Sequence, residues 1–333
     1  MIEFTIVLAI LVLISLLTFD SGNTFGKEKL PALKVFMAIV IILGHMSFRS
    51  PLQVIQPFRF WGAPFVSMFL FISGYGMWKS YETACSISFS SILSRIGKLL
   101  VPYVITVVLY YLFVRLPAHD TVIDIREMII TGTSRQSHLW FVFAIVFLYL
   151  VFYSCVKLRD KIGIVFAMFI MVAITVLLLR KIGYDRCWYV SLMAFPTGCF
   201  CSMARERIDG IVFKNRLWYS GAELLAVVCV GLTYILGGEL AYCVSHMFIP
   251  VAITLVIIQL PYERINNRVI KHLGSISYEL YLCQLIVMDS VAFFLPEVSP
   301  YLYVILVLAG SLIVAEIITA ISQVFFKLML RNQ

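Results

Sequence analysis

The sequence predicts an all-α polytopic membrane protein, on the basis of its composition, its hydropathy pattern and the placement of its charges. The chain has 333 residues, of which 62% are hydrophobic and only 13% charged, and its mean hydropathy is +0.98. Soluble domains carry about a quarter of their residues as charged side chains, so this chain lacks the surface of a water-soluble enzyme. The net charge of +8 lies in short clusters between apolar runs, which argues against nucleic acid as a partner.

Apolar segments of membrane-crossing length follow one another along the whole chain. A helix needs about twenty apolar residues to cross a bilayer, and the alternation typical of a β-barrel is absent from the sequence. We therefore predict about eleven transmembrane helices in a cell (inner or plasma) membrane, with the lipid bilayer as a partner. The predicted spans are 2–19, 32–48, 61–78, 97–116, 139–156, 162–179, 188–204, 218–236, 241–260, 276–295 and 301–326.

The first span and the basic residues of the loops predict on which side of the membrane each end of the chain lies. Residues 2–19 lack the basic start and the small-residue cleavage site of a signal peptide, so we predict a retained anchor. Alternate loops carry eighteen and eight Lys and Arg residues, and the richer set includes the C-terminal end. Because cytoplasmic loops are enriched in these residues, we expect the N-terminus outside and the C-terminus in the cytoplasm.

The second predicted span carries a histidine and a lysine on one face. Polar groups inside membrane spans are functional candidates by default, and His45 lies in such a span near its outer end. Lys34 precedes it by eleven residues, which correspond to about three helical turns and a rise of about 16 Å. A neutral imidazole can take a proton from a hydroxyl nucleophile. The alternative is a histidine whose hydrogen bonds are satisfied by a neighbouring helix.

Further polar candidates flank the third, fourth and fifth spans. Arg95 and Lys98 lie one turn apart at the cytoplasmic start of span 97–116, where they could bind phosphate groups or act as an ordinary basic flank. Ser73 and the adjacent Gly74 permit a close approach of backbones and a polar pocket. His138 and Trp140 begin span 139–156 on the same side as His45, although a tryptophan there is also typical of the membrane interface.

The acidic residues and cysteines give weaker indications. Asp289 and Glu316 lie inside spans and Glu279 at the start of one, so a carboxylate could orient His45, or each could pair structurally. Glu223 and Glu239 are predicted to lie in water at helix ends. The eight cysteines form no CxxC pair and no zinc-ligand spacing, so we predict no metal cofactor.

Five motifs in order resemble the acyltransferase 3 family of membrane acyltransferases over residues 30–325. They are Lys34-x10-His45, the Phe71-Ile-Ser73-Gly segment, the basic pair Arg95 and Lys98 before Pro102, the His138-Leu-Trp140 opening, and Leu273-Gly-Ser-Ile-Ser-Tyr278-Glu-Leu-Tyr281-Leu. The resemblance implies a ten-helix acyltransferase domain over residues 31–333. Residues 1–30 would then add one transmembrane helix and a cytoplasmic loop.

The resemblance also implies an activity. Family members move an acyl group, usually acetyl from cytoplasmic acetyl-CoA, onto a hydroxyl of a surface or lipid-linked saccharide. His45 corresponds to the essential histidine, as general base or acyl carrier, while Lys34, Arg95 and Lys98 correspond to donor-binding positions. Ser73, His138, Trp140, Tyr278 and Tyr281 are candidates for the pocket or acceptor side.

The chain departs from the family pattern at two positions. Lys98 replaces an arginine and lacks its planar fork for phosphate. Gln284 stands where many relatives have a histidine after the Tyr-x-x-Tyr-Leu motif, so an amide must take that residue's place.

The main alternative function is a transporter or flippase for a glycan or small solute, without covalent chemistry. Asp289 and Glu316 would then be coupling groups. The absence of an inverted repeat in the sequence argues against it. A polysaccharide polymerase or ligase is less favoured, because the long external loop typical of such enzymes is missing.

Overall fold

The computed structural model describes residues 2–20, 26–118, 140–158, 160–259 and 267–331, and these residues form helices and no strands. The first half of the described chain contains α1 (Ile2–Leu17), η1 (Lys27–Lys29), α2 (Leu30–Ser47), η2 (Gln53–Phe60), α3 (Gly62–Ala84), α4 (Phe89–Tyr110), the π-helical η3 (Tyr111–Arg115), α6 (Trp140–Cys155) and η5 (Val156–Leu158). The second half contains α7 (Lys161–Ile182), η6 (Arg186–Trp188), α8 (Ala194–Met203), α9 (Arg205–Val212), α10 (Arg216–Leu236), α11 (Glu239–Gln259), α12 (Arg268–Ser275), α13 (Ser277–Phe294) and α14 (Pro300–Arg331).

Several helix ends follow from local sequence. Asp160 caps α7 through its Oδ2 atom, which accepts a hydrogen bond from the Gly163 amide at 2.6 Å. Asn215 caps α10 in the same way, and its Oδ1 atom lies 3.0 Å from the Trp218 amide. Such caps satisfy amides that the helix leaves without a partner. The helix α7 ends at Gly183, whose φ of +89° favours glycine.

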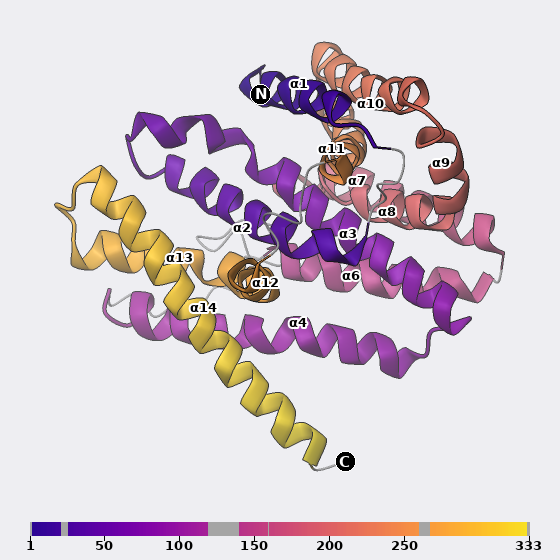
Figure 1. Ribbon diagram of the computed structural model, residues 1–333. Helices are drawn as coiled ribbons and strands as arrows, with labels where there is room; N and C mark the ends of the chain where they lie inside the picture. The colour runs from indigo at the N-terminus through magenta and orange to yellow at the C-terminus, as the bar shows by residue number, and fades with distance from the viewer. Residues whose placement is uncertain (1, 21–25, 119–139, 159, 260–266, 332–333) are drawn as a thin grey trace.

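The long helices α2, α3, α4 and α6 run in similar directions across the bundle (Figure 1). The α2 helix packs against α3, α12 and α13, and α3 packs against α8 and α11, so α2 and α3 lie at the centre. Two pairs, α10 with α11 and α13 with α14, flank this centre, and α1 packs on α10 and α11. The C-terminal end of α14 extends away from the other helices (Figure 1).

A close helix contact joins α3 to α8 through two glycines. A Cβ atom at Gly74 would lie 2.1 Å from the carbonyl oxygen of Phe195, and one at Gly198 would lie 2.1 Å from that of Phe71. Either distance is far inside van der Waals contact, so only glycine fits at both positions. The close approach predicted for Gly74 is confirmed, and its partner is the short helix α8.

The described residues include seven helices that are long and apolar enough to cross a membrane, or up to nine if each bent pair counts as one span. The bent pairs are η2 with α3, at 50°, and α12 with α13, at 68°. Two of the eleven predicted spans fall short of membrane length: α1 has 16 residues and α8 has 10. The protein is therefore an all-helical, multi-pass membrane protein, for which the structure supports seven to nine spans.

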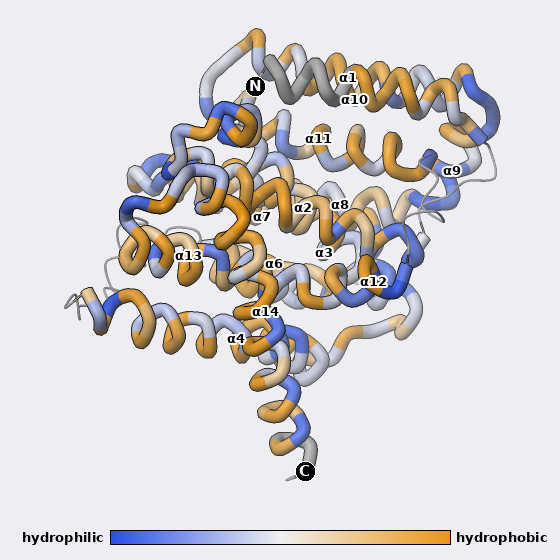
Figure 2. Tube along the Cα trace, turned by 60° about the vertical axis from the view of Figure 1, so that its left-hand side comes forward, coloured by the Kyte–Doolittle hydropathy of each residue, from blue (hydrophilic) through white to orange (hydrophobic). Residues whose placement is uncertain are grey.

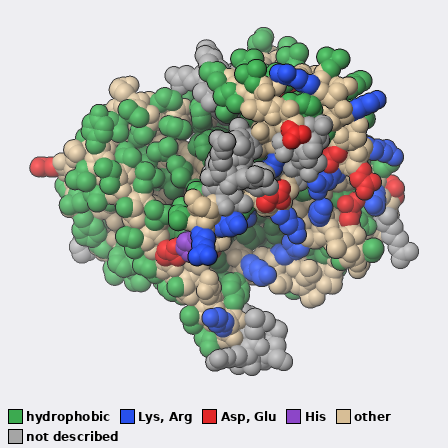
Figure 3. All heavy atoms as spheres, viewed as in Figure 1, with side chains coloured by type: hydrophobic (Ala, Val, Ile, Leu, Met, Phe, Trp, Pro, Cys, Tyr) green, Lys and Arg blue, Asp and Glu red, His purple; other side chains and the backbone are tan. Residues whose placement is uncertain are grey.

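Polar residues are distributed unevenly over the bundle. The tube of Figure 2 is mostly hydrophobic along α4 and α10, whereas α9 and the region of α12 carry hydrophilic residues. The face in Figure 3 is almost entirely hydrophobic at its left, and its charged side chains gather at the centre and right. An apolar surface with charge gathered at one side is typical of a helix bundle that lies across a bilayer.

The prediction that Glu223 lies in water is wrong. Its side chain is fully buried between α10, α1 and α11. Oε1 of Glu223 accepts hydrogen bonds from Ser15 at 2.6 Å and from Tyr219 at 2.7 Å. The residue is buried because α1 covers this face of α10. Glu239, in contrast, is partly exposed at the start of α11 and forms an ion pair with Arg180 at 2.8 Å.

Candidate functional site

The side chain of His45 lies in the last turn of α2 and is oriented by a glutamine of α13. Nδ1 of His45 lies 2.9 Å from Oε1 of Gln284, and Nε2 of Gln284 donates to the main-chain oxygen of Tyr281 at 2.9 Å. Because a carbonyl oxygen can only accept, the amide nitrogen of Gln284 must face Tyr281 and its oxygen must face His45. The proton of a neutral His45 ring is therefore on Nδ1, and Nε2 carries the lone pair.

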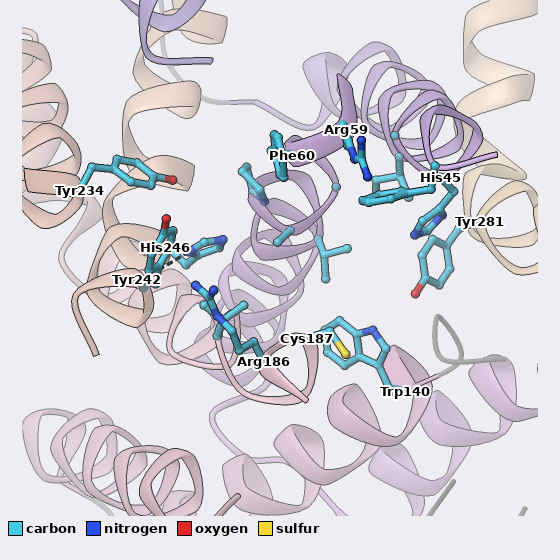
Figure 4. A pocket seen from close by; sticks show the side chains of 18 residues that line it. His45, Arg59, Phe60, Trp140, Arg186, Cys187, Tyr234, Tyr242, His246 and Tyr281 are labelled. Carbon is cyan, nitrogen blue, oxygen red and sulfur yellow. Dashed lines mark hydrogen bonds between the residues drawn. The ribbon is translucent and has the colours of Figure 1, made fainter. Parts of the chain in front are cut away.

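A cavity of about 570 Å³ opens beside His45 (Figure 4), and we call it the His45 cavity. Its volume is typical of sites for small ligands. Its walls come from the end of α2, from η2, from the starts of α3 and α6, from η6, and from α10, α11 and α13. The lining residues are Ile41, Gly44, His45, Phe48, Arg59, Phe60, Gly62, Ala63, Pro64, Val66, Trp140, Arg186, Cys187, Val190, Tyr234, Tyr242, His246 and Tyr281.

The His45 cavity is aromatic and positively charged. Two guanidinium groups line it, and each lies over an aromatic ring: Arg59 is 4.7 Å from the ring centre of Phe48, and Arg186 is 4.4 Å from that of Tyr242. No carboxylate is among the lining residues in the described part of the chain. Such a cavity favours a ligand with an apolar face and negative charge.

A second cavity, of about 750 Å³, lies at the other end of α2 and α3, and we call it the Lys34 cavity. It is lined by residues around the start of α2, by the second half of α3 and by the start of α9. Among the described residues, four cations line it, Lys27, Lys34, Lys79 and Arg205, and one carboxylate, that of Glu28. This excess of positive charge suits a ligand with several phosphates.

The three predicted donor-binding residues do not all lie at one cavity. Lys34 lines the Lys34 cavity. Arg95 lies beside it and donates from Nη2 to the hydroxyl of Ser80 at 3.0 Å, and Ser80 lines the cavity. Lys98 is exposed on α4 and is not among the lining residues. Arg205 and Lys79 line the cavity without having been singled out from the sequence.

The other predicted site residues lie at different depths. Trp140 and Tyr281 line the His45 cavity, and both side chains are buried. The hydroxyl of Ser73 lies 2.9 Å from that of Tyr149 between α3 and α6, and Tyr278 donates to the main-chain oxygen of Leu99 at 2.9 Å. His138 lies outside the described residues.

A narrow space lies between the two cavities along α3. It is lined by Val66, Phe69, Phe141, Tyr278 and Tyr281. Val66 and Tyr281 also line the His45 cavity, and Phe69 lies one turn before Ile72, which lines the Lys34 cavity. One face of α3 therefore passes from the first cavity to the second.

Two of the carboxylates predicted inside the membrane segments, Asp289 and Glu316, bind groups other than His45. Asp289 pairs with Arg49 and accepts from the hydroxyl of Tyr110 at 2.8 Å. Glu316 pairs with His272. No three His, Cys, Asp or Glu side chains converge where they could hold a metal ion, within the residues that the structure describes.

The sequence reasoning missed His246 and Arg186, which share a cavity with His45. His246 lies in predicted span 241–260, so the rule that singled out His45 also applies to it. Arg186 begins η6 just after α7, and in the sequence it counts only as a basic residue between two predicted spans. Nothing in the spacing of the chain indicates that either residue lies near His45.

Comparison with known families confirms the resemblance seen in the motifs. The family model of an acyltransferase domain, that of the acyltransferase 3 family, matches residues 28–320. The match begins in η1 and leaves α1 outside it. No curated protein and no solved structure gives a significant match to the chain.

Proposed function

Because the chain belongs to the acyltransferase 3 family of membrane acyltransferases, we propose that it is a membrane O-acyltransferase. It transfers an acyl group, acetyl from cytoplasmic acetyl-CoA, onto a hydroxyl of a cell-surface or lipid-linked saccharide. The Lys34 cavity faces the cytoplasm and binds the donor, and the His45 cavity faces the opposite side and binds the acceptor.

The acceptor step follows from the orientation of His45. Its Nε2 atom takes the proton of the saccharide hydroxyl as the hydroxyl oxygen attacks the thioester carbonyl. Gln284 holds the ring through Nδ1 and accepts a stronger hydrogen bond once the imidazolium forms. The carbon–sulfur bond then breaks, and the CoA thiolate takes up a proton, so that the products are the ester and free CoA.

A second route uses the same residue as an acyl carrier. In that route Nε2 attacks the thioester, CoA leaves, and the acyl-imidazole is then attacked by the saccharide hydroxyl. Both routes need the lone pair on Nε2: it faces the saccharide hydroxyl in the first route and the thioester carbonyl carbon in the second. The carrier route alone predicts that label from acetyl-CoA remains on the protein when no acceptor is present.

The donor step is supported by the charge of the Lys34 cavity. Lys27, Lys34, Lys79 and Arg205 provide cations for the phosphates of CoA. Lys34 and His45 are eleven residues apart on one helix, which separates their Cα atoms by about 16 Å. The pantetheine arm of CoA is long enough to span such a distance, and its proposed route follows the face of α3 that joins the two cavities.

The observation that carries this proposal is a single helix, α2, with a cationic cavity at one end and an oriented histidine at the other. Its test uses membranes with wild-type protein, His45→Ala or His272→Ala, supplied with radiolabelled acetyl-CoA. We expect label in lipid-linked or polymeric glycan with wild-type and His272→Ala, and none with His45→Ala. His272 is the matched control because it is exposed and pairs with Glu316.

Two outcomes would count against the proposal. Full incorporation by His45→Ala at normal protein levels would remove His45 from the chemistry. Movement of an unmodified glycan across the membrane without acetyl-CoA would instead favour a transporter, the alternative function for this chain.

A further inference from the structure

His246 carries an acceptor atom for which the described part of the protein provides no donor. Its side chain is 3% exposed, and it points into the His45 cavity from the wall opposite His45 (Figure 4). Nδ1 of His246 lies 2.7 Å from the main-chain oxygen of Tyr242, so Nδ1 carries the proton of the neutral ring. Nε2 is buried and has no hydrogen-bond partner among the described residues. Buried polar atoms are rarely left unsatisfied, so a ligand hydroxyl is the expected donor.

A cation lies on the same wall. The guanidinium of Arg186 rests on the ring of Tyr242, the residue whose carbonyl holds His246. Arg186 is exposed to solvent, so its charge is accessible from the cavity. The rings of Tyr234 and Tyr242 meet edge to face at 5.3 Å and complete this wall.

The geometry points to a binding subsite for a sugar that carries a carboxylate or a phosphate. Arg186 binds the anionic group, Nε2 of His246 accepts a hydrogen bond from a hydroxyl of the same sugar, and the tyrosine rings pack against its C–H face. We define this group, Arg186, Tyr234, Tyr242 and His246, as the anion subsite. The inference deepens the proposed function, on which it rests, because it names the class of acceptor saccharide.

A neutral sugar does not account for the charge of this cavity. Two guanidinium groups line it and no carboxylate among the described lining residues balances them. An uncharged ligand offers neither guanidinium an anion, whereas an oxyanion forms charge-assisted, often bidentate, hydrogen bonds with a guanidinium. His45 lies on the other wall, so a sugar held at the anion subsite can still present a hydroxyl to His45 (Figure 4).

The test measures binding without any acyl donor. Full-length protein in lipid nanodiscs is titrated with methyl glucuronide, glucose 6-phosphate or methyl glucoside, and the dissociation constants are compared. We expect the glucuronide or the phosphate to bind at least about tenfold more tightly than the glucoside, in line with a hydrogen-bonded charge. The more tightly bound of the two charged sugars identifies the anion as a carboxylate or a phosphate.

Four variants assign the effect to residues. Arg186→Gln should abolish the preference for the charged sugar. Lys181→Gln is the control, because it removes a positive charge from an exposed residue outside the cavity, and the preference should remain. His246→Asn keeps an N–H group that can donate to the Tyr242 carbonyl but removes the acceptor atom Nε2. It should weaken binding of the charged sugar by about two- to twelvefold. His246→Gln restores a polar atom at that depth and should recover most of the loss.

The results separate this inference from the proposed function. Equal binding of the glucoside and the charged sugars, a preference that survives in Arg186→Gln, or no binding of any of the three sugars would overturn the anion subsite. Selective binding without acetyl transfer would support the subsite and contradict only the proposed acyltransferase activity. Acetyl transfer with no preference for charged sugars would support the proposed acyltransferase activity and overturn the anion subsite.

Discussion

Nδ1 of His45 lies 2.9 Å from Oε1 of Gln284, and these two residues join α2 to α13 at the wall of the His45 cavity. The motif comparison left open what a glutamine does where many relatives have a histidine. In the structure the amide orients the ring, because its own nitrogen is held by the Tyr281 carbonyl. The partner of this ring nitrogen is therefore a neutral group and not one of the carboxylates of the membrane segments.

Replacing Gln284 by leucine should lower the rate of acyl transfer while the protein still folds. The change leaves the buried Nδ1–H group without its acceptor and frees the ring to rotate. An unsatisfied group of this kind costs about 1–3 kcal/mol, which corresponds to about a five- to 150-fold loss in kcat. The KM for acetyl-CoA should not change, because Gln284 is remote from the Lys34 cavity.

Gln284→His is the matched control for this substitution. It places a residue found in many relatives at the position and supplies a ring nitrogen to His45, so activity should stay near that of the wild type. Wild-type kcat in well-folded Gln284→Leu would show that the hydrogen bond has no part in the reaction.

Arg205 and Lys98 should differ in their effect on the donor. Arg205 lines the Lys34 cavity, whereas Lys98 is exposed outside it. Arg205→Gln should raise the KM for acetyl-CoA by about three- to tenfold with little change in kcat, because it removes a partly exposed contact to phosphate. Lys98→Gln, with the same loss of charge, should leave KM unchanged. A larger rise in KM for Lys98→Gln than for Arg205→Gln would contradict this assignment and favour Arg95 and Lys98, the pair predicted from the sequence, as the phosphate-binding residues.

Gly198→Ala should destabilise the contact between α3 and α8. The added Cβ atom would lie 2.1 Å from the carbonyl oxygen of Phe71, so the helices must separate. Overpacking of this kind costs about 1–3 kcal/mol, which should lower the melting temperature of the detergent-solubilised protein. Gly76→Ala is the control, since no atom lies within 4 Å of a Cβ there and alanine favours a helix. Equal melting temperatures for the two variants would contradict the close packing.

The thiol of Cys187 should react slowly with maleimides at neutral pH. Burial, together with the nearby charge of Asp185, raises the pKa of Cys187 to about 12. The thiolate is the reactive form, so the labelling rate should rise about tenfold for each pH unit between pH 7 and 9 without levelling off. Mass spectrometry of the labelled peptide measures this rate, with Cys187→Ala as the blank. A plateau near pH 9 would indicate an ordinary thiol instead.

Several features of the site could be predicted from the sequence because they lie within one helix. The spacing of Lys34 and His45 sets their relative position through helical geometry alone, and the structure places them at two cavities at opposite ends of α2. Gly74 was predicted to allow a close approach, and it does. In each case the inference needed only the helical repeat and the size of a side chain.

Other features depend on contacts between helices that are far apart in the chain. Glu223 was predicted in water because nothing along α10 indicates that α1 covers it. Arg205 lines the Lys34 cavity because α9 follows the helix, α8, that packs on α3. Apolar helices present similar surfaces to many neighbours, so a single sequence does not specify which faces meet.

The sequence by itself determined that this protein is an all-helical membrane protein of the acyltransferase 3 family, with His45 on one face of a central helix. Its hydropathy and motif order contain that information directly. Only the tertiary structure decided that Gln284 orients His45 and that His246 and Arg186 face the same cavity. Those relationships join residues from different helices and loops that lie far apart in the chain, and side-chain packing between helices brings them together.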